Sequence, residues 1–296
     1  MTEEFRSGFV AVVGRPNVGK STLINYLARQ KIAIVSEKPQ TTRHQIRCIV
    51  TRPDAQIIFV DTPGFHKPRS LLGQHLNRTV RNALADTDVV FFMVDAFSGI
   101  GRGDHYLARE LRRIKTPVLL ILNKVDAVSP EHLREQLNKA EELNQLSAII
   151  PISALRGTGV DEALEKAAKL LPLGPRYYPQ DSVTDQPESV IISEFVRERV
   201  LELTREEVPH SVAVEVEEIK PREGKDLLDV QVTIFVERES QKAILIGRNG
   251  RMLKEIGIRA RRDVERLLGS HINLQLWVKV KKDWTRDEAA LRRMGY

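Results

Sequence analysis

The chain has 296 residues, of which 42% are hydrophobic and 29% are charged, and its formal net charge is +6. This length predicts roughly two domains, and this balance of residue types is typical of a soluble globular protein. The single cysteine, Cys48, excludes an internal disulfide and a cysteine-based zinc site, and no stretch approaches the ~18 unbroken apolar residues of a membrane helix.

The first 171 residues alternate short apolar runs with helical patterns. Buried strands are predicted at 9–13, 55–60, 88–94, 117–122 and 147–152, and helices at 21–30, 70–84 and 131–145. Near-continuous apolar strands that alternate with helices indicate a mostly parallel α/β sheet that is covered on both faces. Ligands of such sheets bind at the carboxyl ends of the strands, so we expect the functional residues of this domain there.

A second domain is predicted after a proline-rich linker at 172–187. A helix at 188–206 is followed by alternating strands at 210–219 and 226–237, two helices that are broken at 247–250, and a last strand at 272–280. This α-β-β-α-α-β order predicts a smaller α+β domain over 188–282, with helices on one face of its sheet. The remaining residues, 283–296, are expected to form a basic C-terminal tail.

Charge is distributed unevenly in this second domain. Residues 188–239 hold seven Lys and Arg against fourteen Asp and Glu, whereas residues 240–266 hold eight against three. A solvated helix face is the ordinary explanation of a charge run. The basic run here lies beside a glycine turn, which favours an anionic partner at that turn.

The sequence GRPNVGKS follows the first strand and opens a helix, as a phosphate-binding P-loop does. Lys20 is placed for the outer phosphates and Ser21 for magnesium, while backbone N–H groups and the helix N-terminus supply partial positive charge. The predicted phosphate-binding residues are Gly14, Arg15, Pro16, Asn17, Val18, Gly19, Lys20, Ser21 and Thr22.

Later strands end in residues that suit magnesium and guanine. DTPG follows the strand at 55–60, so Asp61 is expected at magnesium through water and the Gly64 N–H at a γ-phosphate, with Thr62 and Pro63 beside them. In NKVD, the Asp126 carboxylate can accept from the two N–H donors of guanine, which adenine lacks. The remaining predicted base-site residues are Asn123 and Lys124 of NKVD, and Ser153, Ala154 and Leu155 of the SAL sequence.

The order GRPNVGKS, PQTTR, DTPG, NKVD, SAL resembles that of GTP-binding proteins. By that resemblance PQTTR at 39–43 is the first switch loop, and Thr42 supplies a second hydroxyl to magnesium. Lys20, Thr42 and Gly64 are therefore the predicted catalytic residues. Phe65 stands where many GTPases have a glutamine that orients water, and phenylalanine has no donor or acceptor for this. In related GTPases with this replacement, the residue matching Asn17 ligates potassium, although an asparagine can equally serve only to shape the loop.

The break at GRNG resembles the GxxG loop of KH domains, which clamps a nucleic-acid backbone. The α-β-β-α-α-β order matches the prokaryotic KH topology. Ile244 and Ile246 are candidates for an apolar floor under the bases, with plain core packing as the alternative for each. The predicted RNA-binding residues are Ile244, Ile246, Gly247, Arg248, Asn249, Gly250, Arg251, Lys254 and Arg259.

A P-loop GTPase domain followed by a KH-type domain resembles the Era family of bacterial GTPases. The resemblance includes PQTTRHQIR, LIGRNGRMLKEIGIRAR and DEAALRRMGY. It implies GTP/GDP and Mg²⁺ as cofactors, slow hydrolysis of GTP, and binding to the 3′ end of 16S ribosomal RNA during 30S subunit assembly. It also implies a cytoplasmic location, peripheral association with the inner membrane and, as we expect, a monomer.

Three functions remain open at this point. The protein is an RNA-responsive GTPase, or an RNA-binding module that uses GTP as a structural ligand, or a GTPase whose second domain docks a protein or anionic lipid. Phe65 favours the second of these, and turnover on addition of RNA distinguishes it from the first.

Overall fold

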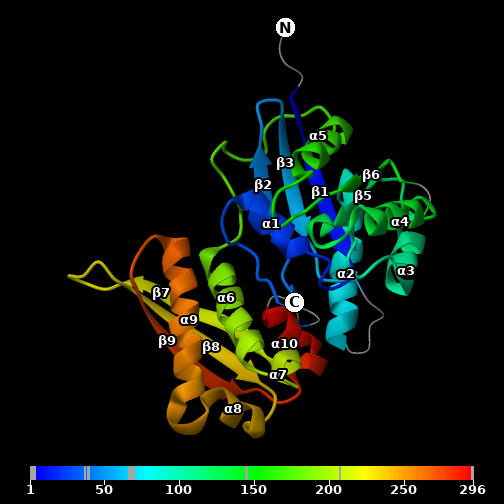
Figure 1. Ribbon diagram of the computed structural model, residues 1–296. Coiled ribbons are helices and arrows are strands. Elements are labelled where there is room, and N and C mark those ends of the chain that lie inside the picture. Colours follow the sequence, from blue (N-terminus) through cyan, green and yellow to red (C-terminus); the bar gives the residue numbers. More distant parts are fainter. Residues whose placement is uncertain are drawn as a thin grey trace. The chain divides into compact units, whose positions relative to one another are not determined.

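We describe the protein from a computed structural model (Figure 1), which describes residues 5–36, 38, 41–65, 71–143, 146–206 and 208–294. Parts of four predicted segments lie outside these residues: the switch-loop residues Pro39 and Gln40, the helix start at Ser70, the helix end at Asn144 and Gln145, and the last two residues of the tail.

By its internal contacts the chain divides into two compact units. The first comprises Met1–Ala33, Thr42–Arg69 and Gly73–Asp185, and the second comprises Ile34–Thr41, Ser70–Leu72 and Gln186–Tyr296. Each unit is described by itself below.

The first unit contains a six-stranded sheet in the order β2-β3-β1-β4-β5-β6 (Figure 1). All neighbouring strands are parallel except β2, which runs antiparallel to β3. The strands are β1 (Arg6–Gly14), β2 (Ile46–Thr51), β3 (Ala55–Asp61), β4 (Val89–Asp95), β5 (Val118–Asn123) and β6 (Ala148–Pro151). The five strands predicted from apolar runs are confirmed, while β2 at the sheet edge was not predicted.

Helices cover both faces of this sheet, as the apolar runs predicted. Along β1, Val10 and Val12 pack into a core with α1 and α5, whereas Ala11 and Val13 pack into another core with α2, α3 and α4. Neither α3 nor α5 was among the predicted helices. The helices are α1 (Lys20–Ala28), α2 (Leu71–Ala85), α3 (Arg102–Leu111), α4 (Pro130–Glu141) and α5 (Val160–Leu170), with a short 3₁₀ helix η1 (Val125–Ala127).

The proline-rich segment after α5 is bonded along the sheet of the first unit. The backbone N–H of Ser7 donates to the Pro172 carbonyl over 3.1 Å, and that of Ile49 donates to the Val183 carbonyl over 2.8 Å. The Gln56 side chain accepts from the N–H groups of Tyr177 and Tyr178 at 2.8 and 2.9 Å. The stretch that we expected as a linker is thus held by the first unit as far as Asp185.

The second unit contains a three-stranded sheet in the order β7-β8-β9. Strands β7 (Ala213–Pro221) and β8 (Leu228–Val236) are antiparallel, and β9 (Ile272–Val280) pairs with β8 in parallel. Alternate residues of β8 are fully buried in one core, while Trp277 of β9 is 42% exposed. The helices are α6 (Glu188–Leu203), α7 (Val208–Ser211), α8 (Glu239–Ile246) and α9 (Arg251–Leu268), with the 3₁₀ turn η2 (Arg248–Gly250). The predicted KH-type order is confirmed, with α7 as an addition.

Ile34, Val35 and Thr41 are held in this second unit, although they precede the first sheet's second strand. Ile34 is buried among the apolar side chains of the unit. The backbone N–H of Val35 donates to the Glu198 carboxylate at 2.9 Å, and the buried Arg197 guanidinium donates to the Thr41 carbonyl. A piece of chain that the sequence placed in the nucleotide domain is therefore held by α6.

The chain beyond β9 also packs on the second unit. It forms η3 (Trp284–Arg286) and α10 (Glu288–Arg293). Trp284 is fully buried, and its indole N–H donates to the Ser211 carbonyl over 3.0 Å. The expected tail thus supplies a core side chain.

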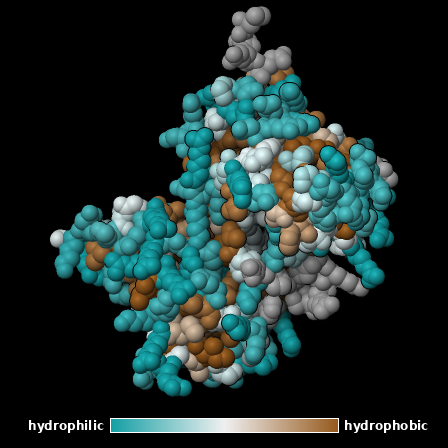
Figure 2. Space-filling model, viewed as in Figure 1, coloured by the Kyte–Doolittle hydropathy of each residue, from teal (hydrophilic) through white to brown (hydrophobic). Residues whose placement is uncertain are grey.

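Figure 2 shows a face that is mostly hydrophilic, with apolar atoms in separate small areas. Among the described residues, every helix is too short or too polar to span a bilayer.

Candidate nucleotide and nucleic-acid sites

The P-loop between β1 and α1 has a backbone that only particular residues adopt. Asn17 and Gly19 have φ values of 66° and 101°, a left-handed region that favours glycine and tolerates asparagine. A Cβ added at Gly19 would lie 2.2 Å from the Asn123 amide nitrogen. The loop therefore passes too close to the NKVD sequence for any side chain at position 19. Val18 is buried, Asn17 is exposed, and Pro16 and Thr22 are half-buried.

Lys20 lies at the first position of α1 and is almost completely buried. Its ammonium donates to the carbonyls of Gly14 and Arg15 over 3.2 and 2.9 Å. Burial lowers the pKa of Lys20 to about 8, against the attraction of Asp61, which raises it. A buried ammonium whose hydrogen bonds within the described part of the chain go to backbone carbonyls is a favourable site for an anion, because phosphate oxygens would stabilise its charge.

Three oxygen-bearing side chains meet beside Lys20. The Ser21 hydroxyl donates to the Asp61 carboxylate at 2.9 Å and lies 3.0 Å from the Thr42 hydroxyl. Asp61 is fully buried at the end of β3. The structure thus brings together the three residues predicted for magnesium, and their oxygens are the ligand type that this ion prefers.

The DTPGF sequence closes against the P-loop. The Thr62 hydroxyl donates to the Val12 carbonyl over 2.7 Å, and the Phe65 N–H donates to the Gly14 carbonyl over 3.1 Å. The Phe65 ring is 4% exposed and stacks on Tyr106 of α3, with ring centroids 5.7 Å apart. Phe65 therefore serves as a packing residue directly after the DTPG sequence. Pro63 is buried and Gly64 is half-buried.

The base-site sequences are tied to the P-loop through Asn123. Its amide donates to the Val18 carbonyl over 2.8 Å and its oxygen accepts from the Ala154 N–H at 2.9 Å. Asn123 and Ala154, both predicted at the guanine edge, are thus bonded to each other in the structure. The Lys124 ammonium bonds to Asp95 at 2.8 Å, and the Asp126 carboxylate lies 3.6 Å from Arg156. Ser153 is fully buried and Leu155 is 74% exposed.

The GRNG turn between α8 and α9 has three left-handed residues. Gly247, Asn249 and Gly250 have φ values of 70°, 54° and 74°. A Cβ at Gly247 would lie 2.7 Å from that of Met252, whereas one at Gly250 would meet no described atom within 4 Å. Gly247 is therefore required by packing, and Gly250 leaves open space above the start of α9.

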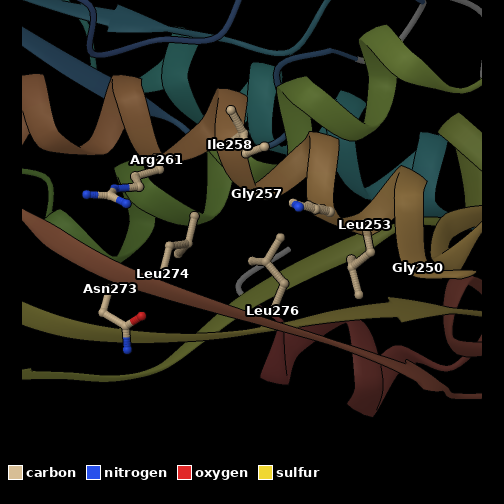
Figure 3. A pocket seen from close by; sticks show the side chains of 9 residues that line it. Gly250, Leu253, Gly257, Ile258, Arg261, Asn273, Leu274 and Leu276 are labelled. Carbon is tan, nitrogen blue, oxygen red and sulfur yellow. The ribbon is translucent and has the colours of Figure 1, made fainter.

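A groove of about 370 Å³ begins at Gly250 and continues between α9 and the free edge of β9. In Figure 3, Leu274 and Leu276 point from β9 toward α9, while Asn273 points away from the helix. The lining residues are Gly250, Leu253, Lys254, Gly257, Ile258 and Arg261 of the loop and helix, and Asn273, Leu274 and Leu276 of the strand. Gly250 and Lys254 are among the RNA-binding residues predicted from the sequence. The β9 wall was missed because strand pairing, rather than a local motif, places it opposite α9.

The other predicted RNA-binding residues lie around this groove or away from it. Arg248, Asn249 and Arg251 are exposed at the GRNG turn. Ile244 is 46% exposed, whereas Ile246 packs against the core, which is the alternative of plain core packing given for it above. The Arg259 guanidinium is bonded to Glu255 and Glu202 at 2.6 and 2.5 Å, so its charge is already balanced.

Family models match parts of both domains. A model described as 50S ribosome-binding GTPase matches residues 9–124, and a KH domain model matches residues 207–285. The chain is 52% identical over 292 residues to the GTPase Era of Carboxydothermus hydrogenoformans, covering 99% of this chain and 98% of the relative.

Two solved structures match over 99% of this chain and 99% of their own chains, each with a TM-score of 0.95. One is a variant of Aquifex aeolicus Era bound to GDP and AlF₄⁻, at 39% identity. The other is Era in complex with MgGDPNP and nucleotides 1506–1542 of 16S ribosomal RNA, at 40% identity. Since the similarity extends over essentially the whole chain and includes the nucleotide and KH motifs, the chain belongs to the Era family of GTPases.

Proposed function

We propose that the protein hydrolyses GTP, binds the 3′ end of 16S ribosomal RNA and assists maturation of the 30S subunit. One observation carries the RNA part of this proposal: the groove at Gly250 begins at a GxxG turn and continues between α9 and β9. A relative of the same length and fold was solved with nucleotides 1506–1542 of that RNA. An RNA strand whose backbone lies at the turn would place its bases over this partly apolar groove.

For the GTP site, we propose that Ser21 and Thr42 hold Mg²⁺ directly and Asp61 holds it through water. The hydrogen-bonded arrangement of their oxygens fits this ion. Magnesium supplies charge neutralisation on the phosphates when it is bound. Lys20 would leave the two loop carbonyls for phosphate oxygens, and the Gly64 N–H would donate to the γ-phosphate.

At the base site, Asp126 would accept from guanine while Asn123 holds the P-loop and the Ala154 loop together. For RNA, Gly247 to Arg251 would hold the backbone and Lys254 would add charge at the groove. Ile244 is exposed enough to contact a base, whereas Ile246 supports the turn from the core side. Arg259 would contribute only after its bonds to Glu202 and Glu255 break.

Potassium is the proposed source of additional charge during hydrolysis. Phe65 is buried and has no polar group to orient water, so another group must stabilise the transition state. Asn17 is exposed in the P-loop with a left-handed backbone, a position from which its amide oxygen can face a cation beside the phosphates. We expect faster single-turnover hydrolysis in potassium than in sodium, and loss of that difference in Asn17→Ala.

The remaining parts of the proposal concern location and assembly state. We propose a cytoplasmic monomer that associates peripherally with the inner membrane through its exposed basic residues. Binding to vesicles that contain anionic phospholipids tests the membrane association. If basic residues hold the protein at the membrane, this binding should weaken steeply as salt is added.

The deciding experiment measures RNA binding and GTP turnover together. A 16S 3′-end oligonucleotide should bind the full chain and change its GTP hydrolysis rate, while a scrambled oligonucleotide of equal length should do neither. If the RNA binds but turnover stays unchanged, GTP acts as a structural ligand. If vesicles bind more tightly than the RNA at matched salt, the second unit is a lipid-docking domain.

A further inference from the structure

The side chain of the P-loop residue Arg15 is bonded to the segment Ser98–Tyr106. Its Nε donates to an Asp104 carboxylate oxygen at 2.9 Å, and its Nη2 donates to the Gly99 carbonyl at 3.0 Å. The segment runs from the end of β4 into the first turn of α3. The structure thus links the phosphate loop to a neighbouring part of the first unit through one side chain.

Asp104, the partner of Arg15, is held in place by the segment itself. It is fully buried, and its other carboxylate oxygen accepts from the Gly101 N–H at 2.9 Å. Burial raises the pKa of Asp104, while the Gly101 N–H and the Arg15 guanidinium lower it. A Cβ at Gly103 would lie 2.6 Å from the Arg15 Cδ, so the glycine makes room for the arginine. The Arg15 side chain is 29% exposed and that of Asp104 is fully buried, so loss of Arg15 would leave a buried carboxylate without its charge partner.

The backbone of Arg15 belongs to the arrangement around Lys20. The Arg15 carbonyl accepts from the Lys20 ammonium at 2.9 Å, and the adjacent Gly14 carbonyl accepts from both Lys20 and the Phe65 N–H. Phe65 in turn stacks on Tyr106 of the same segment. Residues 98–106 therefore hold the P-loop through Arg15 and contact the Phe65 ring through Tyr106.

We propose that Arg15 and Asp104 are positioning residues for GTP hydrolysis, which act by fixing the P-loop backbone around Lys20. In this role the Arg15 side chain need not touch the nucleotide. GTP binding sums many contacts and tolerates a small shift of the loop. Hydrolysis requires alignment, and a misplacement of about 1 Å can slow a reaction by about a hundredfold.

The test compares Arg15→Ala, Arg15→Lys and Asp104→Asn with Arg102→Ala, which removes an exposed arginine of the same segment. We expect single-turnover hydrolysis to fall roughly ten- to a hundredfold in Arg15→Ala and Asp104→Asn, while the Kd for GTP changes by less than about threefold. Arg15→Lys should rescue little, since an ammonium cannot reproduce the fork of donors. Arg102→Ala should match the unmodified protein.

A double-variant cycle separates positioning from general destabilisation. Arg15→Ala combined with Asp104→Asn should hydrolyse GTP no more slowly than the slower of the two single variants, because both substitutions remove the same link. Multiplicative losses in the double variant would overturn the proposal. So would an equal loss in hydrolysis and GTP affinity, or unchanged hydrolysis in Arg15→Ala. If Asp104 variants fail to fold, the affinity and hydrolysis of Arg15→Ala and Arg15→Lys still decide it.

Discussion

The nucleotide site and the RNA groove use side chains in opposite ways. At the first, Lys20, Asp61 and Asn123 are buried, and their polar atoms bond to neighbouring loops. At the second, the charged residues are exposed and the lining is partly apolar, with Ile258 42% exposed. A wrong ligand leaves buried polar groups without partners, which costs much binding free energy, whereas affinity in an open groove is the sum of many weaker contacts. Single substitutions should therefore have larger effects at the first site.

The largest expected effect is a change of base specificity by Asp126→Asn. Loss of the carboxylate that accepts from guanine should weaken GTP binding about a thousandfold or more. Xanthosine triphosphate should bind instead, because xanthine offers an acceptor where guanine offers an amino group. Competition binding with both nucleotides measures this. Effective competition by ATP in the unmodified protein would contradict the assignment of Asp126 to guanine. The ion pair between Asp126 and the exposed Arg156 should contribute little to the affinity for either nucleotide.

At the groove, Gly250→Asp should weaken RNA binding by roughly a hundredfold through repulsion of the phosphate backbone. The matched control is Gly250→Asn, which has the same shape without the charge. Asparagine tolerates this left-handed position, as Asn249 beside it demonstrates. RNA titrations of the two variants should differ strongly, and both should bind GTP normally. Equal RNA affinity in the two would exclude a phosphate at this turn.

Lys20 should give GTP binding a pH dependence that RNA binding lacks. In the nucleotide-free protein the pKa of Lys20 is about 8, and bound phosphates raise it. Affinity should therefore be constant below pH 8 and fall about tenfold per unit above it, because binding must then take up a proton. Titrations between about pH 7 and 9 test this, with Lys20→Arg as the control that stays protonated. A flat profile in the unmodified protein would show that Lys20 does not change its charge.

The smallest effect should come from Gly257→Ala in the middle of α9. The new methyl group would lie 3.4 Å from a Leu276 methyl, an ordinary contact that narrows the groove. RNA affinity should fall by roughly three- to tenfold, while the helix gains up to about 1 kcal/mol from the loss of glycine. Thermal unfolding and RNA titration together check this. Stronger RNA binding by Gly257→Ala would indicate that the bases do not lie in this groove.

GRPNVGKS, DTPG, NKVD and SAL each lie at or just after the end of a strand, so the sequence could place them at one edge of the parallel sheet, whereas Thr42 was assigned by resemblance to GTP-binding proteins. Ser21, Thr42 and Asp61 come from three separate segments, and the parallel sheet brings their hydroxyls and carboxylate together as expected. The link between Arg15 and Asp104 could not be predicted in this way. It joins residues 89 apart in sequence, and an arginine within a P-loop carries no local signal about its partner.

The groove was harder to predict for a related reason. GRNG identified the turn, but β9 forms the opposite wall only because it pairs in parallel with β8. The sequence also gave no sign that 34–41 pack with α6. A short stretch without helix or strand periodicity does not reveal which core it joins.

That stretch determines how the protein can be cut for experiments. A fragment beginning at residue 186 would lack Ile34, leaving a gap in its apolar core, and would deprive Arg197 of the Thr41 carbonyl. Loss of a buried isoleucine side chain typically costs about 2–5 kcal/mol, enough to threaten a domain of this size. A fragment ending at residue 185 would keep Ile34 but lose the core in which it packs, and so would expose this apolar side chain. RNA affinities measured on isolated halves would therefore report the damage done by the cut as well as the binding itself.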